Sequence, residues 1–224
     1  AANFAKLLGK VKSASRYIRA AQEIKEGLLK YLYDSKRGVF YKMINKNETG
    51  EIIVDDTPDS SSFYGLFNFG LLDPDDKRVN NMAKWLKKEV SPGTNVGGLC
   101  RYGDDKYYRR AGNLNCNPWF VTTFWYVEWL IAKAKSEKDL AEVKNILAWA
   151  IKYAQASGIL SEQLDSETGN QLSAAPLVWS QAGLVMVWLS IWINWKSLVS
   201  ARPVIQCIKL KYESSNLSCL NSSL

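Results

Sequence analysis

The sequence predicts an all-α protein whose helices form part of an α/α toroid, two concentric rings of antiparallel helices. Amphipathic helical segments alternate along the chain with segments that are apolar on nearly every side. An amphipathic helix has one face for water and a fully apolar helix has none, so the first kind suits an outer ring and the second an inner ring. The longest connections, 34–58, 91–117 and 157–175, each lead from an outer helix to an inner one. We therefore expect these three segments on the same rim.

The first outer helix is expected over residues 13–33. Its apolar residues recur at three- and four-residue steps with charged residues between them, the pattern of a helix with one exposed face. A small β-hairpin follows, because 38–41 and 51–54 are β-prone runs on either side of the turn at 47–50. The uncharged run 60–72 then predicts a short inner helix.

The second outer helix is expected to begin with Asp73 as its N-cap and Pro74 at the first helical position. Apolar residues keep helical spacing as far as Val90, with basic residues on the other face. The segment 91–117 that follows is rich in Gly, Asn, Asp, Arg and Tyr. Loops of this length in a compact domain are usually functional or disordered.

The inner helix of the second pair is expected over 119–131, opened by Asn117 as N-cap and Pro118 at the first position. It is apolar almost all round, which predicts burial. Its charged residue, Glu128, would have a raised pKa in such surroundings and could look like a proton donor. Glu128 falls more than two turns below the rim, however, so we expect it to be structural or partly solvated.

The third outer helix is expected to begin at a capping box of Ser136 and Asp139 and to keep an apolar stripe as far as Ala154. The run 174–195 contains no charge and predicts the third inner helix. It is long enough to cross a bilayer. Pro176, other polar residues within it and the lack of flanking basic clusters favour a buried helix over a membrane span.

Composition limits the chemistry. Histidine is absent, which excludes imidazole catalysis and His-ligated metals, so hydrolysis would rely on carboxylates. The net charge of +7 is spread over helix faces, and no nucleic-acid partner is expected. Nine tryptophans and eleven tyrosines suit a sugar-binding surface as well as a large core. The four cysteines are scattered, without a C-x-x-C pair, and are expected to be reduced, which favours a cytoplasmic location.

The loop 157–175 leads into the motif SEQLDSETGNQLSAAPLVWS, which contains Glu162. Taken alone, Glu162 is an ordinary surface acid in a turn. The motif resembles the catalytic-base segment of glycoside hydrolase family 15, the glucoamylases and their relatives. The resemblance implies that Glu162 is the general base, which deprotonates the water that attacks the anomeric carbon of a terminal α-linked glucose, with inversion.

A second segment, 97–120, reads GGLCRYGDDKYYRRAGNLNCNPWF. It resembles the substrate-binding segment of the same family. An Arg supplies a planar fork of donors for sugar hydroxyls, and a Trp offers a face on which glucose can stack. Taken singly, these residues also suit a surface ion pair, aromatic core packing and a helix start. The resemblance implies that the substrate is held by Arg101, Tyr102, Asp105, Tyr107 and Trp119, with Asp104 as a binding or scaffold residue.

The resemblance covers roughly residues 1–190, with a weaker match at 59–79. It implies that residues 1–195 are the C-terminal half of an (α/α)6 catalytic domain, followed by an irregular tail, 196–224, of unknown role. The family commonly has His where this chain has Gln181. No match to the family's upstream general-acid motif is found. An open half-ring would expose the apolar flanks of its inner helices, which indicates an N-terminal half as partner.

Three readings of the function follow from these patterns. The first is hydrolysis of α-linked glucose from oligo- or disaccharides, with the general acid outside this fragment. The second is a non-catalytic fragment of the same fold that binds carbohydrate or protein, and the third is a membrane-anchored fragment. No cofactor is expected and no metal site is visible, although the Asp-rich segment 54–59 could supply oxygen ligands to calcium. Starch-like, isomaltose-type and trehalose linkages are not distinguished.

Overall fold

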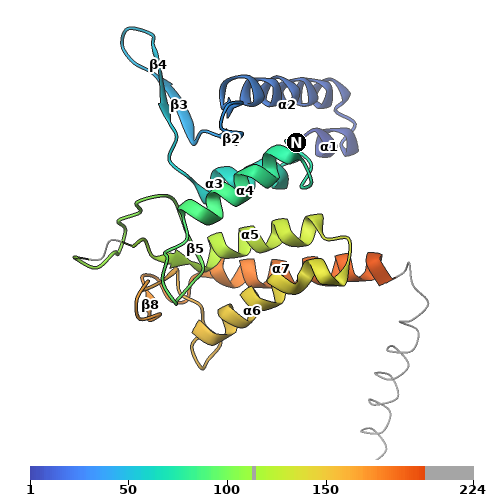
Figure 1. The fold of residues 1–224 in the computed structure, drawn as a ribbon. Helices are drawn as coiled ribbons and strands as arrows, with labels where there is room; N and C mark the ends of the chain where they lie inside the picture. Colours follow the sequence, from blue (N-terminus) through green and yellow to red (C-terminus); the bar gives the residue numbers. More distant parts are fainter. Residues whose placement is uncertain (113–114, 200–224) are drawn as a thin grey trace, which may run out of the picture.

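The computed structural model describes residues 1–112 and 115–199. The predicted tail, 196–224, lies outside this range except for 196–199, which continue the last helix. The fold is mainly helical with small sheets (Figure 1). The helices are α1 Ala2–Leu7, α2 Val11–Tyr31, α3 Ser60–Asn68, α4 Lys77–Glu89, α5 Phe120–Lys133, α6 Ala141–Tyr153 and α7 Val178–Val199, with a short 3-10 helix at Glu137–Leu140. The strands are β1 Tyr33–Asp34, β2 Val39–Phe40, β3 Met43–Lys46, β4 Ile52–Asp55, β5 Leu99–Cys100, β6 Pro118–Trp119, β7 Gln163–Leu164 and β8 Gln171–Leu172.

Helix α5 forms the centre of the core. It lies between α3–α4 on one side and α6–α7 on the other (Figure 1), and nearly all of its residues from Phe120 to Ile131 are buried. The amphipathic helices α4 and α6 each bury a single stripe, which contains Met82 and Leu147 respectively. The expected pairing of outer amphipathic helices with an inner apolar helix is confirmed for these elements.

Helix α7 is only partly covered. Gly183 faces α5 so closely that a Cβ there would stand 3.0 Å from the ring of Phe124, and Val187 is fully buried. The expected complete burial of this helix is therefore wrong for this chain, whereas the expected exposure of apolar inner-helix flanks is confirmed. Among the described residues, no helix combines the length and hydropathy needed to cross a membrane. Within 178–194, the part of α7 whose burial is described, the large exposed apolar residues are Val178, Trp179, Val185, Met186, Trp188, Leu189, Trp192 and Ile193.

The β-hairpin forms with a different register from the one expected. Strand β4 pairs with β3, while β2 pairs with β1. The turn decides this, because the side chain of Asn47 accepts hydrogen bonds from the backbone N–H groups of Thr49 and Glu51. A turn closed at 47–50 pairs the residues immediately beside it, so the run 38–41 is too far back to be the partner strand.

Two helix starts also differ from expectation. Asp76, not Asp73, caps α4 by accepting a hydrogen bond of 2.8 Å from the N–H of Arg78. Pro118 lies in β6, opposite Cys100 of β5, and α5 begins two residues later. Pro74 lies in a turn and Pro118 in a strand, and in both cases the helix begins after the proline. The capping box of Ser136 and Asp139 is confirmed at the start of the short 3-10 helix.

Strand pairing joins the long connections at one rim. A four-stranded antiparallel sheet in the order β5-β6-β7-β8 links 91–117 to 157–175, and an isolated bridge between Asp59 and Tyr102 links the end of 34–58 to the same loop. The shared rim is thus confirmed. Gly98 makes the packing behind this sheet possible: its φ is +81°, and a Cβ there would stand 2.6 Å from the ring of Trp149.

Candidate active site

The pairing of β6 with β7 brings the two chemically interesting segments together. Trp119 of β6 is opposite Gln163 of β7. Glu162, immediately before β7, accepts a backbone hydrogen bond of 3.4 Å from Phe120, the first residue of α5. The predicted general base therefore lies beside the predicted sugar-binding segment and next to the N-terminal end of the buried helix.

Two neighbouring side chains hold the half-buried carboxylate of Glu162. The hydroxyl of Ser173 donates a hydrogen bond to Oε2, and Nε2 of Gln163 approaches the same oxygen at 3.4 Å. Among the described residues, no hydrogen bond is made to Oε1. The arrangement fixes the orientation of the carboxylate and leaves one oxygen for another partner.

Sequence reasoning did not assign a role to Ser173, although a signal was present. Strands β7 and β8 pair with Gln163 opposite Leu172, which places Ser173 across from Glu162. The turn between them is closed by Asp165, whose carboxylate accepts hydrogen bonds from the N–H groups of Glu167 and Thr168. An Asp followed four residues later by a Gly, between two short strand-like segments, is the sequence signal of such a turn. A hairpin closed at this turn places Glu162 opposite Ser173.

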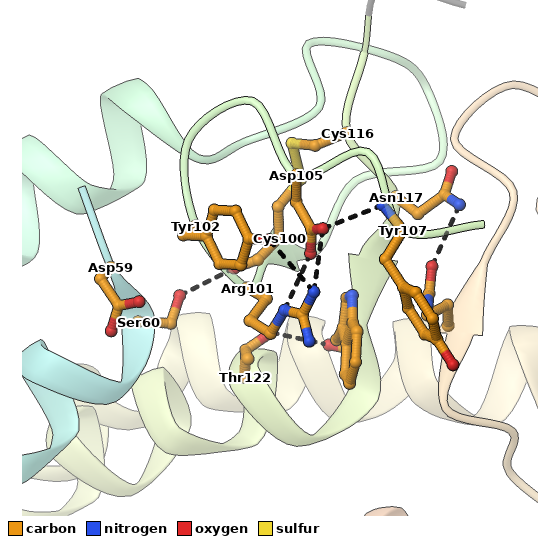
Figure 2. Close-up of polar contacts among 12 residues, drawn as sticks. Asp59, Ser60, Cys100, Arg101, Tyr102, Asp105, Tyr107, Cys116, Asn117 and Thr122 are labelled. Carbon is orange, nitrogen blue, oxygen red and sulfur yellow. Dashed lines mark hydrogen bonds and ion pairs between the residues drawn. A yellow bond between two sulfur atoms is a disulfide. The ribbon is translucent and has the colours of Figure 1, made fainter. Parts of the chain in front are cut away.

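Arg101 is held by a buried carboxylate. Its Nε and Nη2 donate hydrogen bonds of 3.0 Å to the two oxygens of Asp105, which is 2 % exposed. Asp105 also accepts the backbone N–H of Tyr107 at 3.1 Å, so it lies between the guanidinium and the loop backbone (Figure 2). Burial acts to lower the pKa of Arg101, but the hydrogen bonds and charge of Asp105 outweigh it and raise that pKa. This paired geometry locks the fork in place.

The aromatic residues surround the Arg101 guanidinium. Its central carbon lies 4.7 Å from the ring centroid of Trp119, 4.8 Å from that of Tyr102 and 5.4 Å from that of Tyr107. Trp119 is only 4 % exposed, so it leaves little ring surface on which a sugar could stack. The Trp119 indole Nε1 is buried and has no hydrogen-bond partner among the described residues. The exposed aromatic ring beside Arg101 is Tyr107, 46 % exposed.

Cys100 and Cys116 form a disulfide, so the expectation of reduced thiols is wrong for this pair. The two residues are 16 apart in sequence, a spacing without a motif, but the pairing of β5 with β6 sets their Cα atoms 6.0 Å apart. The bond closes the loop that carries Arg101 and Asp105 (Figure 2). Structural disulfides are typical of oxidising compartments, so the cysteines no longer support a cytoplasmic location. Cys207 and Cys219 lie outside the described residues.

The chain matches a known family of glycoside hydrolases over most of its length. The sequence model of the "Mannosylglycerate hydrolase MGH1-like glycoside hydrolase domain" matches residues 1–180. The chain belongs to this glycoside hydrolase family. An uncharacterized glycosyl hydrolase of Methanocaldococcus jannaschii is 34 % identical over 161 residues, which are 68 % of this chain and 23 % of that relative.

Solved structures match this chain in fold. A bacterial glucoamylase complexed with acarbose covers 86 % of the chain with a TM-score of 0.68 and 22 % identity. The family 15 glucoamylase of Hypocrea jecorina gives 0.60 and 20 % over 86 %, and the glucoamylase of Saccharomycopsis fibuligera gives 0.65 and 17 % over 88 %. The expected resemblance to family 15 and the partial α/α toroid are confirmed. The match spans 31 %, 40 % and 53 % of these chains respectively.

Other acids of the chain have structural partners. Glu128 on α5 accepts a hydrogen bond of 3.0 Å from the hydroxyl of Tyr64, and burial raises its pKa. In the segment considered for calcium, Asp55 accepts the N–H of Thr57, and Asp59 caps α3. Among the described residues, no group of three or more acidic or cysteine side chains is arranged to hold a metal.

Proposed function

We propose that this chain supplies the general base and the sugar-binding loop of a hydrolase that releases terminal α-linked glucose with inversion. The observation that carries the proposal is the β6–β7 pairing, which sets Glu162 beside the strand of Trp119 and hence beside the cluster around Arg101. Carboxylate chemistry is also the route that a sequence without histidine leaves open.

In this proposal Glu162 activates the attacking water. Both of its hydrogen bonds from Ser173 and Gln163 fall on Oε2, so Oε1 is the oxygen that would accept the water proton. The water then attacks the anomeric carbon from the face opposite the leaving group. Inversion of configuration follows from this single displacement.

The sugar is proposed to be held at the cluster of Arg101, Tyr102, Asp105, Tyr107 and Trp119, where Arg101 and Tyr107 contact it directly. Asp105 fixes the guanidinium so that it can donate to two sugar hydroxyls without losing side-chain entropy on binding. Trp119 supports Arg101 from behind, and the exposed ring of Tyr107 contacts the substrate.

The general acid is proposed to come from residues outside this chain. An inverting mechanism needs a second carboxyl group about 6.5–9.5 Å from the base, and Glu128, held by Tyr64 within the helical layer, does not suit this role. The chain spans only part of the relatives that it matches. We propose that the rest of the toroid also covers the exposed face of α7 and the cavity of about 950 Å³ between α2 and α3.

The test uses the natural full-length protein, whose extent is first established by intact mass. It is incubated with maltose, isomaltose, trehalose and mannosylglycerate. The last is included because the description of the matching family names a mannosylglycerate hydrolase. We expect hydrolysis of at least one α-glucoside, with β-glucose as the first anomer in a proton NMR time course. Appearance of α-glucose first would contradict inversion. Binding of these sugars without hydrolysis would favour the non-catalytic alternative.

A further inference from the structure

The side chain of Asn117 joins two loops at the candidate site, the one that contains Tyr108 and the one that contains Gln163 and Ser166. Its Nδ2 donates hydrogen bonds of 3.1 Å to the carbonyl of Tyr108 and of 3.1 Å to Oε1 of Gln163. Its Oδ1 accepts the backbone N–H of Ser166 at 3.3 Å. Asn117 is 2 % exposed and Gln163 is fully buried, so water cannot readily replace these bonds.

The bonds of Asn117 determine how Gln163 faces the base. Because Oε1 of Gln163 accepts from Asn117, its Nε2 is turned the other way, toward Oε2 of Glu162 at 3.4 Å. An amide has one donor end and one acceptor end. Fixing the acceptor end of Gln163 therefore fixes its donor end on the carboxylate.

The same side chain holds the sugar-binding loop. Tyr108 has a φ of +57°, a left-handed conformation that non-glycine residues adopt only where the surroundings hold them in it. Its carbonyl is the group that Asn117 binds. Tyr108 follows Tyr107 directly and packs against its ring, with centroids 4.9 Å apart.

We infer that Asn117 is a positioning residue that couples the sugar-binding loop to the orientation of the general base. It touches no reacting atom; it acts on Glu162 through Gln163 and on Tyr107 through Tyr108. The kinetic part of this inference rests on the proposed function, whereas the mechanical coupling of the two loops does not.

The test compares Asn117→Asp, Gln163→Met and the control Asn170→Asp in the natural full-length protein. Asn117→Asp keeps the shape of the side chain and replaces its donor by an acceptor. Asn170→Asp makes the same charge change at an exposed position of the neighbouring turn. Gln163→Met removes both the acceptor and the donor of the Gln163 amide at nearly constant side-chain volume. If Asn117→Asp fails to fold, the test is made with Gln163→Met instead.

Hydrogen exchange gives a readout that does not depend on activity. Asn117→Asp should speed amide exchange in both 104–110 and 163–168 and leave the exchange of α4 unchanged. Gln163→Met should also speed amide exchange in 104–110. Asn170→Asp should leave 104–110 as in the wild type. Faster exchange in only one of the two loops would overturn the coupling. This readout decides the coupling even if the wild-type protein proves inactive, a result that would reject the proposed function by itself.

Kinetics separate positioning from simple loss of stability. Gln163→Met should lower kcat about tenfold, the equivalent of one hydrogen bond of about 1.4 kcal/mol, with KM within about twofold. Asn117→Asp should lower kcat by a similar factor and also raise KM, because the loop is released. The variant that combines Asn117→Asp with Gln163→Met should have a kcat no lower than that of Asn117→Asp alone, because Asn117 acts on Glu162 through Gln163. Additive losses, or an Asn117→Asp variant as active as Asn170→Asp, would overturn the inference.

Discussion

Glu162→Gln should lower kcat by about 10²–10⁴, the usual contribution of a positioned general acid or base, while KM changes little. Glutamine keeps the size of the side chain and can still accept the hydrogen bond from Ser173, so the site should stay assembled. It cannot take a proton from water at neutral pH. Initial rates on the preferred α-glucoside, measured with the full-length protein, check this expectation.

The matched control for this variant is Glu167→Gln. Glu167 is an exposed acid in the same hairpin, five positions after Glu162, and its substitution removes the same charge. It should retain wild-type kcat within about twofold. Equal activity of the two variants would show that Glu162 is an ordinary loop acid.

Of the substitutions considered, loss of the Cys100–Cys116 disulfide should lower the free energy of unfolding most. A bond that closes a loop of 16 residues removes entropy from the unfolded chain equivalent to about 3 kcal/mol. For a domain of this size, the Cys100→Ser/Cys116→Ser variant should melt about 6–12 °C lower. Because the loop carries Arg101 and Asp105, KM should rise more than kcat falls.

Reductant supplies the control for the disulfide. It should lower the melting temperature of the wild-type protein toward that of the double variant and leave the variant unchanged. A wild-type protein that melts at the same temperature with and without reductant, under conditions that cleave the bond, would show that the disulfide contributes nothing. Unequal effects of reduction and substitution would point to packing around Cys116 instead.

Side-chain periodicity was sufficient to predict the helical layers. The near-complete apolarity of 119–131 predicted a buried helix, and α5 is buried. The shared rim also followed from topology, because antiparallel helices place alternate connections at the same end. These predictions depend on many residues at once, so no single misread position could overturn them.

The failures concern single residues whose partners are far away in sequence. The sequence predicted Asn117 as an N-cap, but its side-chain amide donates a hydrogen bond to Gln163, 46 positions later. Cys100 and Cys116 looked unrelated until the strand pairing of β5 with β6 placed them together. Local sequence does not encode these long-range contacts.

The apolar helix α7 shows a different limit. Its uncharged sequence predicted burial of the whole helix, which is wrong for this chain, because sequence alone does not say which segments cover each face. In this structure α5 covers one face, and residues such as Trp188 and Trp192 on the other remain exposed. The proposed remainder of the toroid would cover this exposed face.

Azide rescue of Glu162→Gly measures the central claim most directly. Removing the side chain should open space on the face from which water attacks, and azide needs no base to become a nucleophile. With α-glucosyl fluoride, whose leaving group needs little help from an acid, the account predicts that azide restores turnover of the full-length variant at least tenfold. The product should be β-glucosyl azide, and the wild-type protein should form none. Formation of α-glucosyl azide, or a Glu162→Gly variant that hydrolyses the fluoride at the wild-type rate without azide, would contradict the account.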